Sequence, residues 1–169
     1  MEAQDDLYRR CAAEFGPALL RLARGYENDP DKRRDLLQEI HLALWRSFAI
    51  FDARCSMRTW TYRVAHAAAA TYVLRQRRAR QNLLVALEDV EVPPVAPDAD
   101  HRIALARLTE LIQRLKTLDR EVILLYLEGM EAAEIGEVTG LSARNVATKV
   151  HRIKSVLARD FQEGARHAG

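Results

Sequence analysis

Residues 134–157, EIGEVTGLSARNVATKVHRIKSVL, constrain the fold of this chain more than any other stretch. A helical pattern runs into a TGLS turn, and a second, longer helical pattern starts at once. A helix-turn-helix needs a small residue where its helices cross, a residue able to leave helical geometry in the turn, and an apolar anchor on the second helix. Gly136, Gly140 and Val146 fit these needs in that order, and Ser142 can cap the second helix.

The outward face of the second helix carries basic and amide side chains and no carboxylate between Ser142 and Arg159. Arginine and asparagine pair bidentately with guanine and adenine edges in the major groove. We therefore expect this helix to read DNA. The alternative is an ordinary packing corner, which would not require such a face. The residues on the face are Arg144, Asn145, Thr148, Lys149, Arg152 and Lys154.

Charge divides the 169 residues into three parts, with net +5 over 1–86, −5 over 87–100 and +2 over 101–169. The acidic part, LEDVEVPPVAPDAD, also holds three of the five prolines, which disfavour helix. We interpret it as a linker between an N-terminal helical bundle and the C-terminal helix-turn-helix unit. The alternative is a surface loop within a single domain. Strand-like alternation is almost absent elsewhere, so the predicted fold class is all-α.

Apolar residues at spacings of three and four mark the expected helices. Asp29-Pro30 should begin the second helix, and Ser56 or Thr59 should cap a long third helix. The inward residues of the first two helices are expected to be Leu7, Cys11, Phe15, Leu19 and Leu22, then Leu36, Leu37, Ile40, Leu44 and Phe48. Those of the C-terminal unit are expected to be Ile103, Ala106, Leu108, Leu111, Ile112 and Leu115, then Val122, Ile123, Leu125 and Tyr126.

The long third helix ends in four arginines within six residues and no acid: Arg75, Arg77, Arg78 and Arg80. Arginines near a helix C-terminus complement its dipole, which is one interpretation of this cluster. Four of them exceed what capping needs, and we favour contacts with a nucleic-acid phosphate backbone.

Patterns that would indicate an enzyme or a metal site do not occur in the sequence. It has no Gly-rich phosphate loop, no HExxH and no paired Cys/His set, so we predict no catalysis, no cofactor and no metal. Cys11 and Cys55 form no CxxC, and we interpret them as reduced thiols rather than a disulfide or metal site. The sequence shows no signal peptide and no apolar run of membrane-spanning length, so we expect the cytoplasm.

The order of these parts resembles a bacterial extracytoplasmic-function sigma factor, the smallest class of RNA polymerase specificity subunit. DLLQEIHLALWRSF (35–48) is similar to the polymerase-binding helix of that family. FDARCSMRTWTYRVAH (51–66) is similar to its promoter-opening loop and minus-ten reading helix, and residues 118–157 are similar to its minus-thirty-five reading domain. The resemblance covers nearly the whole chain and implies a transcription initiation factor that binds core RNA polymerase and directs it to promoters.

The resemblance also implies the domain plan and the roles of individual residues. Residues 1–86 would be sigma region 2, residues 87–100 the linker and residues 101–169 sigma region 4. Core polymerase would be bound by Asp35, Gln38 and Glu39. Minus-ten DNA would be met by Arg54, Cys55, Ser56, Arg58, Trp60, Tyr62, Arg63 and His66. The minus-thirty-five element would face Arg144, Asn145, Thr148, Lys149 and Arg152.

Two points limit what the resemblance implies. Family members usually carry Arg-Asn where this chain has His66-Ala67, so the preferred minus-ten sequence stays open. For Trp45 and Trp60, packing in the core is the alternative to a role at the DNA. Core RNA polymerase and promoter DNA are the implied partners, and the family's common arrangement adds an anti-sigma factor.

Two other classes of function fit the sequence less well. A free-standing helix-turn-helix regulator would leave the polymerase-like helix and the Arg75–Arg80 cluster without a role. A protein-interaction adaptor would not require the basic face at 144–154.

Overall fold

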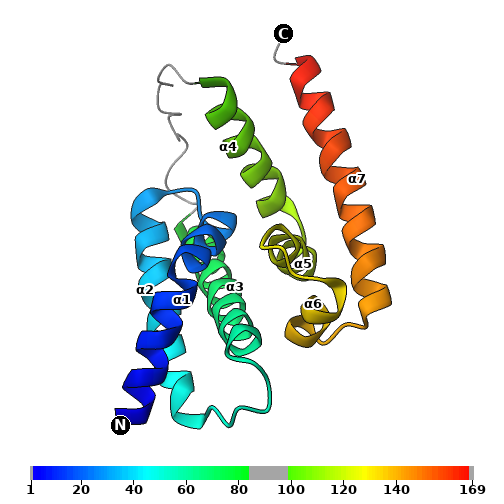
Figure 1. Ribbon diagram of the computed structural model, residues 1–169. Coiled ribbons are helices and arrows are strands. Elements are labelled where there is room, and N and C mark those ends of the chain that lie inside the picture. The colour runs from blue at the N-terminus through cyan, green and yellow to red at the C-terminus, as the bar shows by residue number, and fades with distance from the viewer. Residues whose placement is uncertain (1, 84–98, 168–169) are drawn as a thin grey trace.

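The computed structural model describes residues 2–83 and 99–167, and every regular element in these two ranges is a helix (Figure 1). The all-α prediction is therefore confirmed. The N-terminal half (residues 2–83) holds α1 (Glu2–Tyr26), α2 (Pro30–Ser47), the short 3-10 helix η1 (Phe48–Ile50) and α3 (Met57–Leu83). The C-terminal half (residues 99–167) holds α4 (Ala99–Arg114), α5 (Thr117–Leu127), α6 (Ala132–Thr139) and α7 (Ala143–His167).

The N-terminal half is a bundle in which α1, α2 and α3 all pack against one another. Its helices begin where the sequence predicts. An Asp29 carboxylate oxygen accepts from the backbone N–H groups of Asp31 and Lys32 at 2.9 and 3.1 Å, with Pro30 as the first helical residue. Ser56 caps α3, because its hydroxyl accepts from the Thr59 N–H at 3.0 Å. The predicted apolar stripes form the bundle core, although Leu7 and Leu37 are only half-buried.

The turn between α6 and α7 has the geometry of a helix-turn-helix. Gly140 ends α6 with a φ of 80°, a conformation that favours glycine. A Cβ on Gly136 would lie 2.5 Å from the Leu141 carbonyl oxygen, so only glycine fits at this crossing. Val146 is fully buried, and the Ser142 hydroxyl accepts from the Asn145 N–H at 3.2 Å. The prediction for these positions is confirmed.

Three residues expected to face inward in the C-terminal half are exposed instead, which corrects the sequence prediction. Ile103 and Ala106 lie in the first turns of α4, which extend beyond α5 and α6 (Figure 1), and both are exposed. Tyr126 on α5 is 40% exposed and lies under the Lys154 ammonium, 5.4 Å from its ring centroid. An apolar stripe is buried only where another element covers it, and hydrophobic spacing alone does not show where the covering element ends.

The two halves lie against each other, with α6 on α3 and with α4 and α5 on α1 (Figure 1). The Arg21 guanidinium donates two hydrogen bonds to the Glu128 carboxylate, at 2.7 and 2.8 Å. The Gln113 amide donates to the Arg24 carbonyl oxygen at 3.2 Å and to the Asn28 side chain at 3.0 Å. Of the acidic stretch 87–100, only Ala99 and Asp100 lie within the described residues, and they form the start of α4.

A close contact between α1 and α5 lies at the centre of this interface. A Cβ on Gly25 would be 2.6 Å from the Leu124 side chain, so these helices approach closely at a glycine. Arg120 of α5 is buried and places its guanidinium 5.2 Å from the centroid of the Tyr26 ring. The same guanidinium donates to the Leu115 carbonyl oxygen at 3.2 Å and to that of Gln113. Arg120 thereby links the end of α4 to α1.

Candidate nucleic-acid interface

The first two turns of α7 present three exposed side chains that can reach a DNA groove. Arg144 and Asn145 lie directly after the Ser142 cap, and Thr148 lies one turn further on. The Thr148 hydroxyl donates to the Arg144 carbonyl oxygen at 3.0 Å, so it is partly engaged within the helix. Arg144 and Asn145 keep their long polar side chains at the surface, which is where the sequence predicts them.

Lys149 and Arg152 lie on the same helix but are paired with an acid of α5. The Asp119 carboxylate accepts from the Lys149 ammonium at 2.7 Å and from the Arg152 guanidinium at 2.9 Å. The Asp119 side chain is only 14% exposed. One carboxylate of the same chain therefore offsets part of the charge of two of the five α7 residues assigned to the minus-thirty-five element.

The loop before α3 contains the residues expected at the minus-ten element. Arg54 is 89% exposed and pairs with Asp52 at 2.9 Å. Ala53 between them has a φ of 58°, which is uncommon for a residue with a side chain. Cys55 is half-buried, and Ser56 holds the start of α3 as its cap. Of the loop residues that the sequence assigns to DNA, Arg54 and Ser56 are thus exposed.

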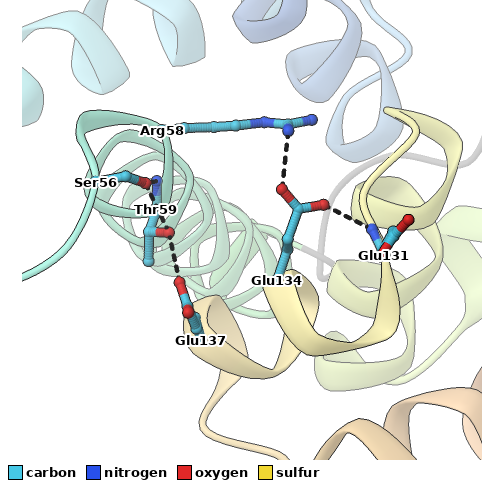
Figure 2. Close-up of polar contacts among 6 residues, drawn as sticks. All are labelled: Ser56, Arg58, Thr59, Glu131, Glu134 and Glu137. Atoms are coloured by element: carbon cyan, nitrogen blue, oxygen red, sulfur yellow. Dashed lines mark hydrogen bonds and ion pairs between the residues drawn. The ribbon is translucent and has the colours of Figure 1, made fainter.

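Arg58 and Arg63, on the first turns of α3, both contact α6. The Arg58 guanidinium lies 3.1 Å from a carboxylate oxygen of Glu134 (Figure 2). The Arg63 guanidinium donates to the backbone carbonyl oxygen of Glu137. Sequence reasoning placed these arginines on a DNA surface and did not foresee their contacts with α6, although Arg63 stays exposed and the Arg58 side chain is 37% exposed.

Trp60 packs against the loop, as the alternative interpretation of this residue proposed. Its indole N–H donates to the Ser47 hydroxyl at 2.9 Å, and its ring centroid lies 5.2 Å from that of Phe51. Trp45 similarly donates its indole N–H to Asp5 at 2.8 Å, which ties the start of α1 to α2. Both tryptophans are half-buried and hold elements together.

Tyr62 and His66, which the resemblance assigns to minus-ten DNA, are buried here. Tyr62 packs edge-on against Phe15, with ring centroids 6.2 Å apart. The His66 Nδ1 atom lies 2.7 Å from the Tyr26 hydroxyl. Burial lowers the pKa of His66 to about 3, so its imidazole is neutral at pH 7. Both residues share a helical face with the buried Ala65 and Ala69, a spacing that indicates the bundle core.

The arginines at the end of α3 differ in their partners. Arg75 pairs with Glu39 of α2 and lies 6.0 Å from the centroid of the Tyr72 ring. Arg77, Arg78 and Arg80 are exposed, as a phosphate-binding role requires. The Arg75–Glu39 pair also engages one of the three expected polymerase contacts, whereas Asp35 and Gln38 are exposed on α2.

The structure adds polar residues that sequence reasoning missed, namely Asp119, Arg120, Glu134 and Glu137. Besides nearby partners of Arg120 and Glu134, each has a partner between 30 and 94 positions away in the chain, and no local motif marks these distant contacts. Glu134 alone had a sequence signal, since an acid three residues after Glu131 fits a capping box, which the structure contains.

Among residues 2–83 and 99–167, no group of three or more His, Cys, Asp or Glu side chains is arranged to hold a metal. Cys11 and Cys55 are free thiols. The Cys11 sulfur lies 3.1 Å from the Thr61 hydroxyl, and burial raises the pKa of this thiol. No helix in the same described residues is long and apolar enough to cross a membrane.

Comparison with known families decides the class of protein. Residues 11–79 match the family described as Sigma-70 region 2, and residues 105–157 match Sigma-70, region 4. The RNA polymerase sigma factor CnrH of Cupriavidus metallidurans is 30% identical over 165 residues, covering 89% of this chain and 84% of that protein. This chain belongs to the extracytoplasmic-function sigma factors of the sigma-70 family. It is a transcription initiation factor that directs RNA polymerase to promoters.

Further relatives agree with this assignment. The sigma factor NccH of Alcaligenes xylosoxydans is 29% identical over 168 residues, covering 92% of this chain and 88% of that protein. The ECF sigma factor SigX of Bacillus subtilis is 26% identical over 142 residues, covering 79% of this chain and 73% of that protein. A free-standing regulator is not favoured, since both sigma regions match in order along the chain.

Two solved structures resemble the fold of the sigma factor along 92% of its length. CnrH in complex with the cytosolic domain of CnrY matches with a TM-score of 0.68 and 25% identity, over 88% of that chain. RpoE in complex with the anti-sigma factor NepR, from Bartonella quintana, matches with a TM-score of 0.70 and 17% identity, over 96% of that chain. The second likeness supports the fold alone.

Proposed function

We propose that the two halves of this sigma factor divide promoter recognition between them. Residues 1–86 act as region 2, which binds core polymerase and opens the minus-ten element. Residues 101–169 act as region 4, which reads the minus-thirty-five element, and residues 87–100 act as the acidic linker. The family matches at 11–79 and 105–157 support this division, since each falls within one proposed domain.

The observation that carries the minus-thirty-five assignment is the exposure of Arg144 and Asn145 in the first turn of α7. Residues at the start of a recognition helix reach base edges in the major groove. Arg144 and Asn145 therefore read bases, and Thr148 supports them one turn later. Lys149 and Arg152 lie further along α7 beside Asp119 and contact backbone phosphates.

The minus-ten element is opened by the loop before α3 and by the exposed side of that helix. Arg54, Cys55 and Ser56 form the loop edge, and Arg58 and Arg63 flank the melted duplex. Trp60 supports the loop through its contacts with Ser47 and Phe51. The buried residues Tyr62 and His66 stabilise the bundle in place of touching DNA. DNA phosphates are contacted by the exposed arginines near the C-terminal end of α3, Arg77, Arg78 and Arg80.

Core polymerase is bound by the polar side of α2, which carries Asp35, Gln38 and Glu39. As a factor that acts on RNA polymerase, the protein works in the cytoplasm and catalyses no reaction of its own. CnrH is held by the cytosolic domain of CnrY in its solved structure. By that likeness, an anti-sigma protein holds this sigma factor inactive until a signal releases it.

Run-off transcription with core polymerase on genomic fragments, including the promoter of its own operon, tests the proposed function. Transcripts that depend on the added protein, and that share minus-ten and minus-thirty-five sequences, are the expected result. A double variant tests the assignment of α2 to polymerase binding. Asp35→Ala with Glu39→Lys should weaken core association without loss of helical content.

The control for this double variant is Asp6→Ala with Glu14→Lys, which makes the same charge change at exposed positions of α1. Core affinity of the control variant should equal that of the unmodified protein in a titration. Equal affinity for all three proteins would remove the polymerase role from this side of α2.

A further inference from the structure

Three arginines from the two halves of the chain line one small cavity near the C-terminal end of α3. Arg77 and Arg80 are three residues apart on α3, so they project from one side of that helix. Arg120 comes from the first turns of α5. The cavity that all three line has a volume of about 150 Å³. Arg77 and Arg120 also line a second cavity of about 300 Å³.

Arg120 is a buried cation whose hydrogen bonds go to neutral groups. The residue is only 3% exposed. Its hydrogen bonds to the carbonyl oxygens of Gln113 and Leu115 both leave from Nη2, and its guanidinium lies 5.2 Å from the centroid of the Tyr26 ring. Within the described part of the chain, its buried Nε–H has no hydrogen-bond partner. Buried charges are normally paired with an opposite charge, so Arg120 is suited to an anionic partner.

Positive charge exceeds negative charge around the 150 Å³ cavity. Burial lowers the pKa of the Arg120 guanidinium below its usual value, and the positive charge of Arg77 lowers it further. Glu27 is the carboxylate that lines the cavity, and one of its oxygens already accepts from the Asp29 backbone N–H at 3.0 Å. A bound anion would therefore offset the repulsion between the arginines.

The neighbouring arginines of α3 do not share this environment. Arg75 forms an ion pair with Glu39 of α2. Arg78 is exposed and lines neither of the two cavities. The excess of positive charge thus belongs to the cavity and not to the whole end of α3.

Phosphate is the anion that fits this set of donors. The planar guanidinium group binds phosphate oxygens through two parallel hydrogen bonds. A phosphate group has at least three acceptor oxygens, so it can accept from several arginines at once, whereas a carboxylate has two. The Gln76 amide, which also lines the cavity, can add a neutral donor.

The size of the cavity indicates a small ligand. Pockets for drug-sized molecules have volumes of roughly 300–1,000 Å³, so about 150 Å³ suits a phosphate or diphosphate group. A DNA duplex cannot enter such a space to reach the buried Arg120.

We propose that Arg77, Arg80 and Arg120 form a binding site for the phosphate group of a small anion in the free sigma factor. The occupant is inorganic phosphate, pyrophosphate or the phosphate end of a nucleotide. Because the donors come from α3 and α5, the site exists only while the two halves lie together, and a bound anion bridges them. This site is independent of the promoter contacts proposed above, because it forms without polymerase or DNA.

Calorimetric titration of the full-length protein with inorganic pyrophosphate, at constant ionic strength in chloride, tests the proposal. One saturable site per chain is expected. Arg77→Ala should weaken pyrophosphate binding by roughly tenfold, because it removes a hydrogen-bonding charge from the site. Arg78→Ala is the matched control, since it removes the same charge one residue away, and it should leave the affinity within about twofold of the original.

Parallel titrations with inorganic phosphate and with ADP distinguish the sources of the phosphate group. Equal affinity for pyrophosphate and ADP would mean that the diphosphate group alone is recognised. Tighter binding of ADP would mean that the second cavity also holds part of a nucleotide. Either result supports the proposed site.

Arg120→Lys tests the buried donor, because lysine keeps the positive charge but lacks the guanidinium fork. Circular dichroism checks that its helical content is unchanged, and pyrophosphate affinity should again fall by roughly tenfold. If this variant does not fold, Arg80→Ala at the exposed side of the site takes its place and should show a similar loss.

Three results would overturn the proposal. Equal losses of affinity in Arg77→Ala and Arg78→Ala would show general attraction to a basic helix end. No saturable binding at pyrophosphate concentrations up to about 10 mM would show that no site exists. Unchanged affinity in a folded Arg120→Lys variant would separate the buried arginine from the ligand.

Discussion

The two helices of this sigma factor proposed to meet DNA begin in opposite situations. At the start of α7, Arg144 and Asn145 are exposed. At the start of α3, Thr59 is buried and both Arg58 and Arg63 contact α6, although Arg63 is also exposed. Both helices follow a serine cap and both carry arginines in their first turns, so they look alike in the sequence.

The difference comes from tertiary contact and not from local structure. The start of α7 lies next to a turn built from Gly136 and Gly140, which leaves its outward side free. The start of α3 lies where the other half of the chain can dock, and α6 supplies carboxylates of the right charge. A basic helix face is therefore evidence of anion binding, but the anion can belong to the same protein.

Among the variants that test this difference between α3 and α7, Gly136→Ala should have the largest effect. The added methyl group would lie 2.5 Å from a backbone oxygen of Leu141, so α6 and α7 must move apart. We expect a loss of about 3 kcal/mol in the free energy of unfolding of the C-terminal half. We expect recognition by α7 and the packing of α6 on α3 to be impaired together, because the orientation of both helices depends on this crossing. Chemical denaturation and minus-thirty-five selectivity in the holoenzyme measure the two losses.

Gly16→Ala is the matched control, because a methyl group there meets no atom within 4 Å in the middle of α1. The gain in helix propensity is opposed by crowding against the ring of Pro17, so we expect the free energy of unfolding to change by less than about 1 kcal/mol. If Gly136→Ala were equally harmless, the close crossing of α6 and α7 would not be what directs the recognition helix.

Arg144→Ala sharpens the comparison between the open and the covered helix. Loss of a base contact should cost about 2 kcal/mol in holoenzyme binding and relax preference at one or two base pairs. It should also weaken DNA binding by the free protein, because Arg144 is already exposed. Arg58→Ala should leave binding by the free protein undiminished, since Glu134 occupies that arginine. Binding to a panel of single-base promoter variants measures both. A uniform loss over all variants would contradict base reading by Arg144.

Most of the helices and the helix-turn-helix could be predicted from sequence because their determinants are local. Asp29-Pro30, Ser56, Ser142, Gly136 and Gly140 act on neighbours within a few positions, and each does what its type and spacing predict. The family match follows from the same local motifs taken in order. Exposure of Arg144 follows as well, because it lies opposite the buried Val146 on α7, and Asn145 lies to the side of the buried stripe.

The features that could not be predicted depend on contacts between residues distant in the chain. Tyr62 and His66 have the chemistry of DNA contacts, and only the position of α1 shows that they are buried. Asp119 pairs with the recognition helix but precedes Lys149 by 30 positions, and nothing local in the sequence links the two residues. The docking of α6 on α3 joins residues about 75 positions apart, so no periodicity could reveal it.

Protonation of Glu121 should change the free energy of unfolding through the contact between α5 and α1. This α5 carboxyl lies near Tyr26 of α1, and burial raises its pKa from 4.5 to about 7. The folded protein therefore binds this proton more tightly than the unfolded chain does. The resulting stabilisation is complete below pH 4.5 and is lost as the pH rises through 7. Glu121→Gln stays neutral, so it should be more stable than the unmodified protein by about 1 kcal/mol at pH 8.

Denaturant titrations of both proteins at several pH values check this expectation. The gain from Glu121→Gln should shrink between pH 7 and pH 5 and vanish near pH 4. A gain that is equal at all pH values would mean that the carboxyl is not buried in the folded state.

The smallest expected effect on DNA binding comes from Asp119, the acidic residue beside α7. Asp119→Asn removes the charge that offsets Lys149 and Arg152 while keeping an oxygen that can accept one hydrogen bond. We expect the holoenzyme to bind all promoter variants more tightly by about 0.5 kcal/mol, with a steeper dependence on salt. Glu110→Gln, at an exposed position of α4, controls for the change in net charge. If Asp119→Asn instead weakened binding or altered the base preference, the carboxylate would be orienting Lys149 and Arg152 toward DNA. The start of α7 would then depend on a contact from another helix, as the start of α3 does, and the contrast between the two helices would be one of degree.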